Sequence, residues 1–217
     1  MIKLNLLWIG IFSGITLATF AASSNPQVLS FDTDHRFPTG WQAGATGGKI
    51  ADWQVVSDPR APSPPNVLSI TRFNDTSDGI FNLFWSPEVP FRNGTIEVKI
   101  RANSGTVDQG GGLIWRAQNS DNYYIARYNP LENNLRLYYV KNARRTLLID
   151  VPNLKVGSNE WFTLKVVHHG TRIEAWLNNK KLIEITDATF TNAGGIGFWT
   201  KADANSAFDN LKVQQEN

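Results

Sequence analysis

Arginine and tyrosine residues recur at alternate positions in the middle of the chain, and their side chains combine hydrogen-bond donors with flat rings. The segments Leu113–Ala117, Tyr123–Tyr128 and Leu135–Val140 have the alternation that predicts three neighbouring antiparallel strands. Successive side chains of a strand point to opposite faces, so one face gathers the polar groups. Arginine offers forked donors for hydroxyl pairs, and flat rings match the apolar C–H face of a sugar. The ligand-binding residues predicted on this face are Arg116, Tyr123, Arg127, Arg136 and Tyr138.

Two of these arginines face each other in the predicted register. Arg127 lies opposite Arg136 when their strands pair, and like charges opposed on a sheet destabilise it. A carboxylate from a neighbouring strand, or an anionic or polyhydroxyl ligand, would offset the repulsion. We expect the guanidinium and phenol groups to point outward as a carbohydrate site. An ordinary solvated face is the alternative.

Trp176 is a further candidate for contact with a sugar. Segments 161–168 and 171–178 are predicted to pair as a hairpin, with Lys165 opposite Glu174. Opposite charges at facing positions support this register. It turns Trp176 outward, either as a platform that stacks on a sugar ring or as a ring covered by a loop or by neighbouring side-chain stems.

Composition excludes several other kinds of chemistry. The 217 residues contain no cysteine, which excludes disulfides, Cys-ligated zinc, iron–sulfur clusters and thiol nucleophiles. A formal net charge of +2 is too small for a nucleic-acid-binding surface. The three histidines lack the helical spacing of metal ligands. We expect no nucleic-acid partner and no organic cofactor.

The first segment predicts export. Residues 1–21 place Lys3 before an apolar run that ends in small residues, the pattern of a secretory signal peptide cleaved near Ala21. The run is also long enough to span a bilayer, so an uncleaved anchor is the alternative. A lipoprotein is excluded because it requires a cysteine. We expect residues 22–217 to form one domain that is secreted or periplasmic and has no membrane contact after cleavage.

The sequence pattern in the rest of the chain predicts β-strands. No long stretch after residue 25 has helical periodicity, whereas alternation of period two recurs. Many short strands separated by turn signals indicate an all-β sandwich or barrel. The predicted strands are Val28–Phe31, Trp53–Val56, Val67–Phe73, Ile80–Trp85, Thr95–Arg101, Leu113–Ala117, Tyr123–Tyr128, Leu135–Val140, Thr146–Val151, Trp161–Val167, Arg172–Asn178, Leu182–Thr186, Gly195–Thr200 and Ala207–Val213.

Several segments read together as the motifs of one protein family. The motifs are Gly112–Gln118, Asp121–Arg127, Asn134–Tyr138, Gly195–Asp203, Ala207–Leu211 and the opening Phe31-Asp32 with Gly40-Trp41. They resemble a bacterial family of secreted concanavalin A-like proteins, the 3-keto-disaccharide hydrolase-like family, over about residues 29–213. The resemblance implies a two-sheet antiparallel jelly-roll sandwich with a concave face, of the type that holds carbohydrate in lectins, laminin-G modules and glucanases.

The resemblance leaves the activity open. Glucanases of the same superfamily carry acids in a Glu-x-Asp-x-x-Glu pattern as nucleophile and acid, and this sequence has no such run. The 3-keto-glycoside activity attached to some relatives needs one base and at most a metal. Glu97 is the weak catalytic candidate, and a solvated strand residue is its alternative interpretation.

A structural calcium near the paired chain ends is also implied by the resemblance. The first and last strands would bring Asp32 and Asp34 close to Asp209, and carboxylate oxygens suit calcium. Alternatively, Asp32 and Asp34 cap a turn.

The leading prediction is a module that binds an oligo- or polysaccharide on its concave sheet, through the arginine–tyrosine face and Trp176. A glycoside-cleaving enzyme of the 3-keto-disaccharide type and a laminin-G-like protein-binding module are the alternatives.

Overall fold

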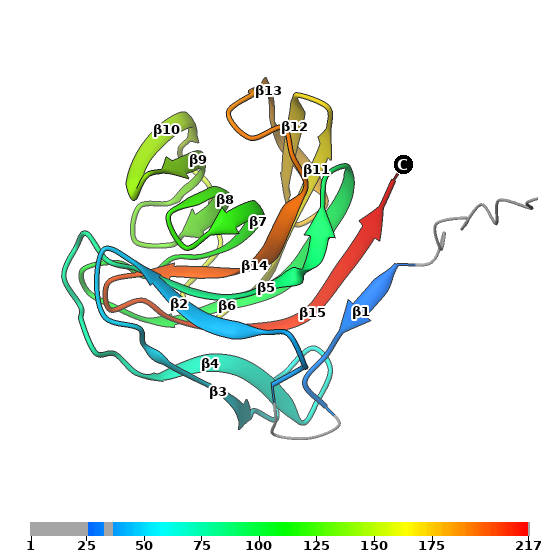
Figure 1. Cartoon of the computed structure of the whole chain (residues 1–217). Helices are drawn as coiled ribbons and strands as arrows, with labels where there is room; N and C mark the ends of the chain where they lie inside the picture. The colour runs from blue at the N-terminus through cyan, green and yellow to red at the C-terminus, as the bar shows by residue number, and fades with distance from the viewer. Residues whose placement is uncertain (1–25, 33–36, 217) are drawn as a thin grey trace, which may run out of the picture.

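The protein folds as a sandwich of two antiparallel sheets, seen in the computed structural model of Figure 1. The structure describes residues 26–32 and 37–216, and these residues contain strands but no helix. The predicted all-β jelly roll is therefore confirmed. None of the described residues belongs to a helix able to cross a membrane. The predicted signal peptide and Asp34 lie outside the described residues.

The back sheet has the strand order β13-β12-β11-β6-β15-β4-β3, with β1 paired to β15. Its strands are β1 (Gln27–Leu29), β3 (Asp52–Ser57), β4 (Asn66–Arg72), β6 (Gly94–Ser104), β11 (Trp161–His169), β12 (Arg172–Leu177), β13 (Lys180–Thr186) and β15 (Asn205–Gln215).

The front sheet has the order β10-β9-β8-β7-β14-β5-β2. Its strands are β2 (Gln42–Thr46), β5 (Phe81–Phe91), β7 (Gly111–Asn119), β8 (Asn122–Asn129), β9 (Asn134–Lys141), β10 (Arg144–Val151) and β14 (Gly194–Lys201). The consecutive hairpins β7-β8-β9-β10 form one side of this sheet, in green at the upper left of Figure 1.

The main core lies between the two sheets. Ile96, Val98 and Ile100 of β6 are fully buried in it, as their alternation with charged residues predicts. The front sheet contributes large rings to the same core, among them Trp115 and Phe198. Apolar surface removed from water stabilises a fold by roughly 25 cal/mol per Å², so this continuous layer holds the sheets together.

A second apolar cluster lies on the outer face of the front sheet, away from the main core. None of its side chains is more than 6% exposed. Its members are Phe81, Leu83, Trp85, Ile114, Ala117, Tyr123, Ile125, Tyr138, Val140 and Trp199. Side chains on a flat, solvated sheet face would be open to water, so this face must be enclosed in some way.

One strand was missed by the sequence prediction. Strand β2 reads Gln-Ala-Gly-Ala-Thr, a composition poor in the β-branched and aromatic residues that strands favour. Strand β5 also runs on to Phe91, beyond the predicted end at Trp85. Both segments form strands because they pair with neighbouring strands, and not because of their intrinsic strand propensity.

The register predicted for the β11–β12 hairpin is wrong by two residues. Lys165 lies opposite Trp176, not opposite Glu174. The turn is formed one residue later than predicted, with Gly170 at a φ of 59°, a left-handed conformation that glycine adopts at little cost. A shift of two residues leaves every side chain on its predicted face.

Candidate functional site

The outer face of the front sheet is strongly concave. Thr46 of β2 hydrogen-bonds the hydroxyl of Tyr123 on β8 at 2.7 Å, although three strands separate β2 from β8. In a flat sheet, strands four places apart would be about 19 Å from each other. The guanidinium of Arg145 on β10 likewise lies 4.9 Å from the ring centroid of Phe81 on β5. The front sheet therefore curls around its outer face, where side chains from distant strands meet.

Glycines on β14 make room for an aromatic floor in this concavity. A Cβ atom on Gly195 would lie 2.8 Å from the Trp85 ring, and one on Gly197 would lie 2.5 Å from Cβ of Trp85. Such distances are too short for real side chains, so only glycine allows the indole to approach the strand this closely. Trp85 and the other members of the second apolar cluster form the floor.

A charged group of four residues lies on the same face, and we call it the arginine–glutamate cluster. Glu132 Oε2 lies 2.7 Å from Arg127 Nη2 and 2.9 Å from Arg136 Nη1. Arg136 Nε lies 2.9 Å from Asp150 Oδ2. Burial favours a raised pKa for Glu132, but the two arginines outweigh it and hold this pKa below its usual value. The cluster is thus a set of fixed donors and acceptors.

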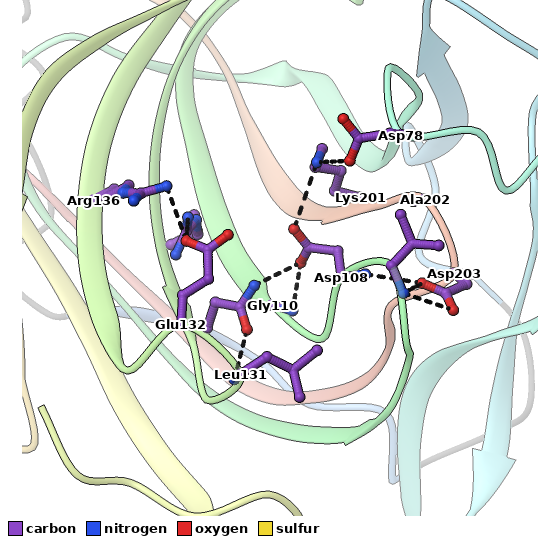
Figure 2. A network of polar contacts seen from close by, with 12 residues as sticks. Asp78, Asp108, Gly110, Leu131, Glu132, Arg136, Lys201, Ala202 and Asp203 are labelled. Carbon is purple, nitrogen blue, oxygen red and sulfur yellow. Dashed lines mark hydrogen bonds and ion pairs between the residues drawn. The ribbon is translucent and has the colours of Figure 1, made fainter. Parts of the chain in front are cut away.

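A buried acid–lysine pair continues the network, as Figure 2 shows. Asp108 Oδ2 lies 3.8 Å from Lys201 Nζ, and Lys201 also pairs with the exposed Asp78. Asp108 Oδ1 accepts a hydrogen bond from the backbone N–H of Gly110 at 2.7 Å. Only 2% of Asp108 is exposed, and burial raises the pKa of its carboxyl despite the nearby positive charges.

Asp203 fixes the loop that carries Asp108. Its carboxylate accepts hydrogen bonds from the backbone N–H groups of Thr106, Val107 and Asp108, at 2.7, 3.0 and 3.0 Å. Burial favours a raised pKa for Asp203, but these hydrogen bonds outweigh it and hold the pKa at about 2. The loop therefore holds Asp108 beside Lys201 in one orientation (Figure 2).

Four of the predicted ligand-binding residues share the concave face. Arg127 lies opposite Arg136 in the register of β8 and β9, which confirms that part of the prediction. Tyr138 accepts hydrogen bonds from both arginines, at 3.3 and 3.4 Å. Tyr123 lies on β8 within the aromatic floor. The carboxylate expected to offset the two arginines is supplied by Glu132.

The expectation that these groups point into water is wrong for three of them. Tyr123, Arg127 and Tyr138 are at most 4% exposed. Curling of the sheet encloses them, and the guanidinium of Arg145 covers the Tyr138 ring at 4.5 Å. Burial accordingly raises the pKa of Tyr123 well above its usual value. A ligand would first meet Arg136 and the carboxylates that pair with it, because these remain partly exposed.

Arg116 does not lie on this face, and its predicted placement there is wrong. It sits where the register of β7 shifts, with a φ of 47°, so the alternation that placed it does not hold. Its guanidinium donates hydrogen bonds to the backbone carbonyls of Arg92, Phe190 and Gly170, at 2.7–2.9, 2.6 and 3.0 Å. Arg116 thus links the three segments that contain these carbonyls.

Trp176 lies on the outer face of the back sheet, on the opposite side of the sandwich. Lys165 Nζ lies 4.0 Å from its ring centroid, and its indole N–H donates to Glu174 Oε2 at 3.2 Å. The structure thus shows the alternative in which the ring packs against neighbouring side chains. Trp176 cannot act together with the concave face, which corrects the predicted grouping.

Glu97 is also on the outer face of the back sheet. Its carboxylate lies 3.6 Å from Lys212 Nζ at a partly exposed position. The surroundings match the interpretation of a solvated strand residue and are remote from the arginine–glutamate cluster.

Asp32 and Asp209 lie together, as the calcium prediction requires. Both carboxylates accept hydrogen bonds from Ser63, and the one from its backbone N–H to Asp209 is 2.9 Å long. Burial raises the pKa of Asp209 to about 6, and the charge of Asp32 adds to the effect. Oδ1 of Asp32 is buried and has no hydrogen-bond partner among the described residues. An oxygen-binding cation fits this pair.

This pair alone does not make a complete metal site. The described residues contain no group of three or more acidic or histidine side chains placed to hold a metal. Backbone carbonyls and water would have to supply further ligands for a calcium ion. The third predicted ligand, Asp34, lies outside the described residues.

Several residues of the concave face were not found from the sequence. Asp108, Lys201 and Arg145 belong to a loop, a strand end and a hairpin that carry no recognisable spacing. Glu132 did leave a signal, because it lies in the turn between the strands that carry Arg127 and Arg136. A carboxylate in that turn can reach both guanidinium groups.

The comparisons with known proteins identify the family. A family model described as the 3-keto-alpha-glucoside-1,2-lyase-like domain matches residues 30–214. The chain belongs to this family. The match confirms the resemblance drawn from the sequence motifs and covers both sheets of the sandwich. No functionally curated protein matches this family member.

Solved structures share the fold of this 3-keto-alpha-glucoside-1,2-lyase-like domain at low sequence identity. A carbohydrate-binding module, CBM66, from Bacillus subtilis is 18% identical, with 80% of this chain and 94% of that chain covered and a TM-score of 0.62. A Bacteroides ovatus GH16 protein of a mixed linkage glucan PUL, in complex with its G4G4G3G product, is 11% identical, with 86% and 99% covered and a TM-score of 0.62. A Bacillus subtilis protein with a galectin-like fold is 14% identical, with 81% and 89% covered and a TM-score of 0.58.

Proposed function

We propose that the protein binds a saccharide on the concave outer face of its front sheet, at the arginine–glutamate cluster. The observation that carries the proposal is the fixed set of forked donors and carboxylate acceptors beside an aromatic floor. Sugars need this combination, because their hydroxyls pair with arginine and carboxylate while their C–H faces pack on rings. Membership of a family named for a 3-keto-α-glucoside lyase supports a sugar as ligand.

The cluster has both an open and a closed side. The side chains of Glu132, Arg136 and Asp150 are 39%, 27% and 32% exposed, so a ligand can reach them. Arg127 beneath them is buried, and its Nε has no acceptor among the described residues. Sugar hydroxyls would therefore pair with the exposed atoms of Arg136 and of the two carboxylates, through charge-assisted hydrogen bonds.

Binding should be tested by calorimetry with methyl α-glucoside, trehalose and their 3-keto forms. Arg136→Ala removes a half-exposed donor and should weaken binding at least tenfold, the effect of one charge-assisted hydrogen bond. The matched control is Arg72→Ala, an exposed arginine on the back sheet that pairs with Asp52. Equal affinity in both variants would overturn the proposed site.

Cleavage of a 3-keto-α-glucoside is the second candidate function, and the raised pKa of Asp108 favours it. A ketone at C3 acidifies the C2–H bond of the sugar. A carboxylate base takes that proton, the C1=C2 bond forms as the C1–O bond breaks, and the leaving oxygen departs as an alcohol after taking up a proton. We assign the role of base to Asp108, whose carboxylate lies 3.8 Å from the positive charge of Lys201.

Turnover of 3-keto-glycosides is measured with and without a chelator, in the wild type and in Asp108→Asn. Loss of turnover in the variant, with saccharide binding retained, supports the catalytic role. Absence of turnover under every metal condition rejects it and leaves the binding function. The predicted signal peptide leads us to propose that the protein acts outside the cytoplasm, in the periplasm or secreted.

A further inference from the structure

The concave face holds an arginine in contact with two aromatic rings from strands that are not neighbours. The guanidinium carbon of Arg145 lies 4.5 Å from the ring centroid of Tyr138 on β9 and 4.9 Å from that of Phe81 on β5. Both distances are within the range of cation–π attraction. Arg145 forms no ion pair within the described part of the chain, so ring contacts are what hold it there.

Arg145 lies on a part of the sheet that can move. Strand β10 is the edge of the front sheet and pairs only with β9. Its register shifts between Leu147 and Ile149, and most of its side chains are exposed or half-exposed. The turn at Asn142 and Ala143, next to Arg145, is exposed. A side chain on such a hairpin can leave the rings without disturbing the main core.

The position that the Arg145 guanidinium occupies is lined by the aromatic and polar groups that a sugar ring needs. Phe81 and Tyr138 offer flat faces for the C–H side of a pyranose. The Tyr138 hydroxyl accepts hydrogen bonds from Arg136 and Arg127, so polar partners lie at the margin of the same ring. Leu147, paired with Tyr138 in the sheet, is 50% exposed and extends the apolar surface outward.

We propose that Phe81 and Tyr138 form the ring-stacking subsite of the concave face and that Arg145 occupies it until a neutral pyranose takes its place. The inference rests on the proposed function. It adds that Phe81 and Tyr138 stack on the sugar ring and that Arg145 opposes binding. Ligand and guanidinium compete for the same two rings, so the affinity measured for the wild type includes the cost of displacing Arg145.

Calorimetry with methyl α-glucoside and trehalose, in both their native and 3-keto forms, tests the competition. Arg145→Ala and Arg145→Gln should each bind roughly 3- to 30-fold more tightly than the wild type, the factor that matches loss of a cation–π contact. Phe81→Leu keeps most of the apolar volume but loses the ring, and it should bind more weakly. Arg144→Ala is the control, because this exposed arginine precedes Arg145 and points to the other face.

The outcomes separate the two proposals. If the wild type binds and Arg136→Ala weakens binding, but the two Arg145 variants fold and show unchanged or weaker affinity, the stacking subsite is rejected while the proposed function stands. If neither the wild type nor any Arg145 variant binds these sugars, both proposals are rejected. Binding that is detected only after Arg145→Ala supports the competition most strongly.

Discussion

Replacement of Glu132 by glutamine tests how the concave face holds its charges. Its carboxylate pairs with Arg127 at 2.7 Å and with Arg136 at 2.9 Å. Glutamine keeps the shape but removes the charge, so Arg127 keeps a buried guanidinium without an ionic partner. Only 2% of the Arg127 side chain is exposed, so its charge is poorly solvated once the carboxylate is lost.

The size of the effect follows from the unequal exposure of the partners. Breaking a fully buried ion pair costs about 3–5 kcal/mol, and breaking an exposed pair costs about 0–1 kcal/mol. The Glu132 side chain is 39% exposed while Arg127 is buried, so we expect Glu132→Gln to lose about 2 kcal/mol of unfolding free energy near neutral pH. For a domain of this size the melting temperature should fall by roughly 4–8 °C.

The loss must also depend on pH in a definite direction. The folded state lowers the pKa of Glu132, so its stabilising effect is present above the unfolded value and disappears as the pH falls through the folded value. Melting curves of the wild type and Glu132→Gln should therefore converge in acid. Calorimetric melting or urea unfolding between neutral and acidic pH measures the difference.

Asp52→Asn is the matched control. Asp52 is also 39% exposed and pairs with Arg72 at 2.8 Å, but the side chain of Arg72 is 70% exposed. We expect it to lose less than about 1 kcal/mol. Equal losses in the two variants, or a Glu132→Gln loss that persists unchanged in acid, would show that the Glu132 charge does not stabilise the buried Arg127.

Three further outcomes follow from the structure. Burial raises the pKa of Asp209 to about 6, so wild-type stability in a chelator should fall as the pH rises from about 4 through 6. Millimolar calcium should reverse that fall, and Asp209→Asn should abolish both effects in melting experiments. Asp203→Asn should speed amide hydrogen exchange at Thr106 and Asp108, whose N–H groups lose their carboxylate acceptor. The variant should also lose less unfolding free energy than the wild type as the pH falls from 3.8 to about 2. Trp176→Ala should leave saccharide affinity in calorimetry unchanged, because Trp176 lies on the other sheet.

The sequence carried enough information for the strands and their faces. Ile96, Val98 and Ile100 alternate with charged residues, and a side-chain period of two has one structural meaning. The pairing of Arg127 with Arg136 could be predicted because a short turn links their strands. A turn displaced by one residue was enough to misplace Lys165 against Glu174.

The enclosure of the concave face could not be predicted in the same way. Tyr123 and Tyr138 are on the predicted face, but their burial depends on how far the whole sheet curls. The curvature of the front sheet depends on packing between strands that are distant in the sheet, as in the contact of Arg145 with Phe81. The bulge that turns Arg116 away is likewise invisible to a strictly alternating pattern.

A crystal structure with bound trehalose or its 3-keto form would show directly which face of the sandwich holds a sugar. We expect a sugar ring on the outer face of the front sheet, with hydroxyls hydrogen-bonded to Arg136 and Glu132. A sugar held on the back sheet beside Trp176 would contradict it. So would a protein partner that copurifies on the concave face and binds without any dependence on sugar.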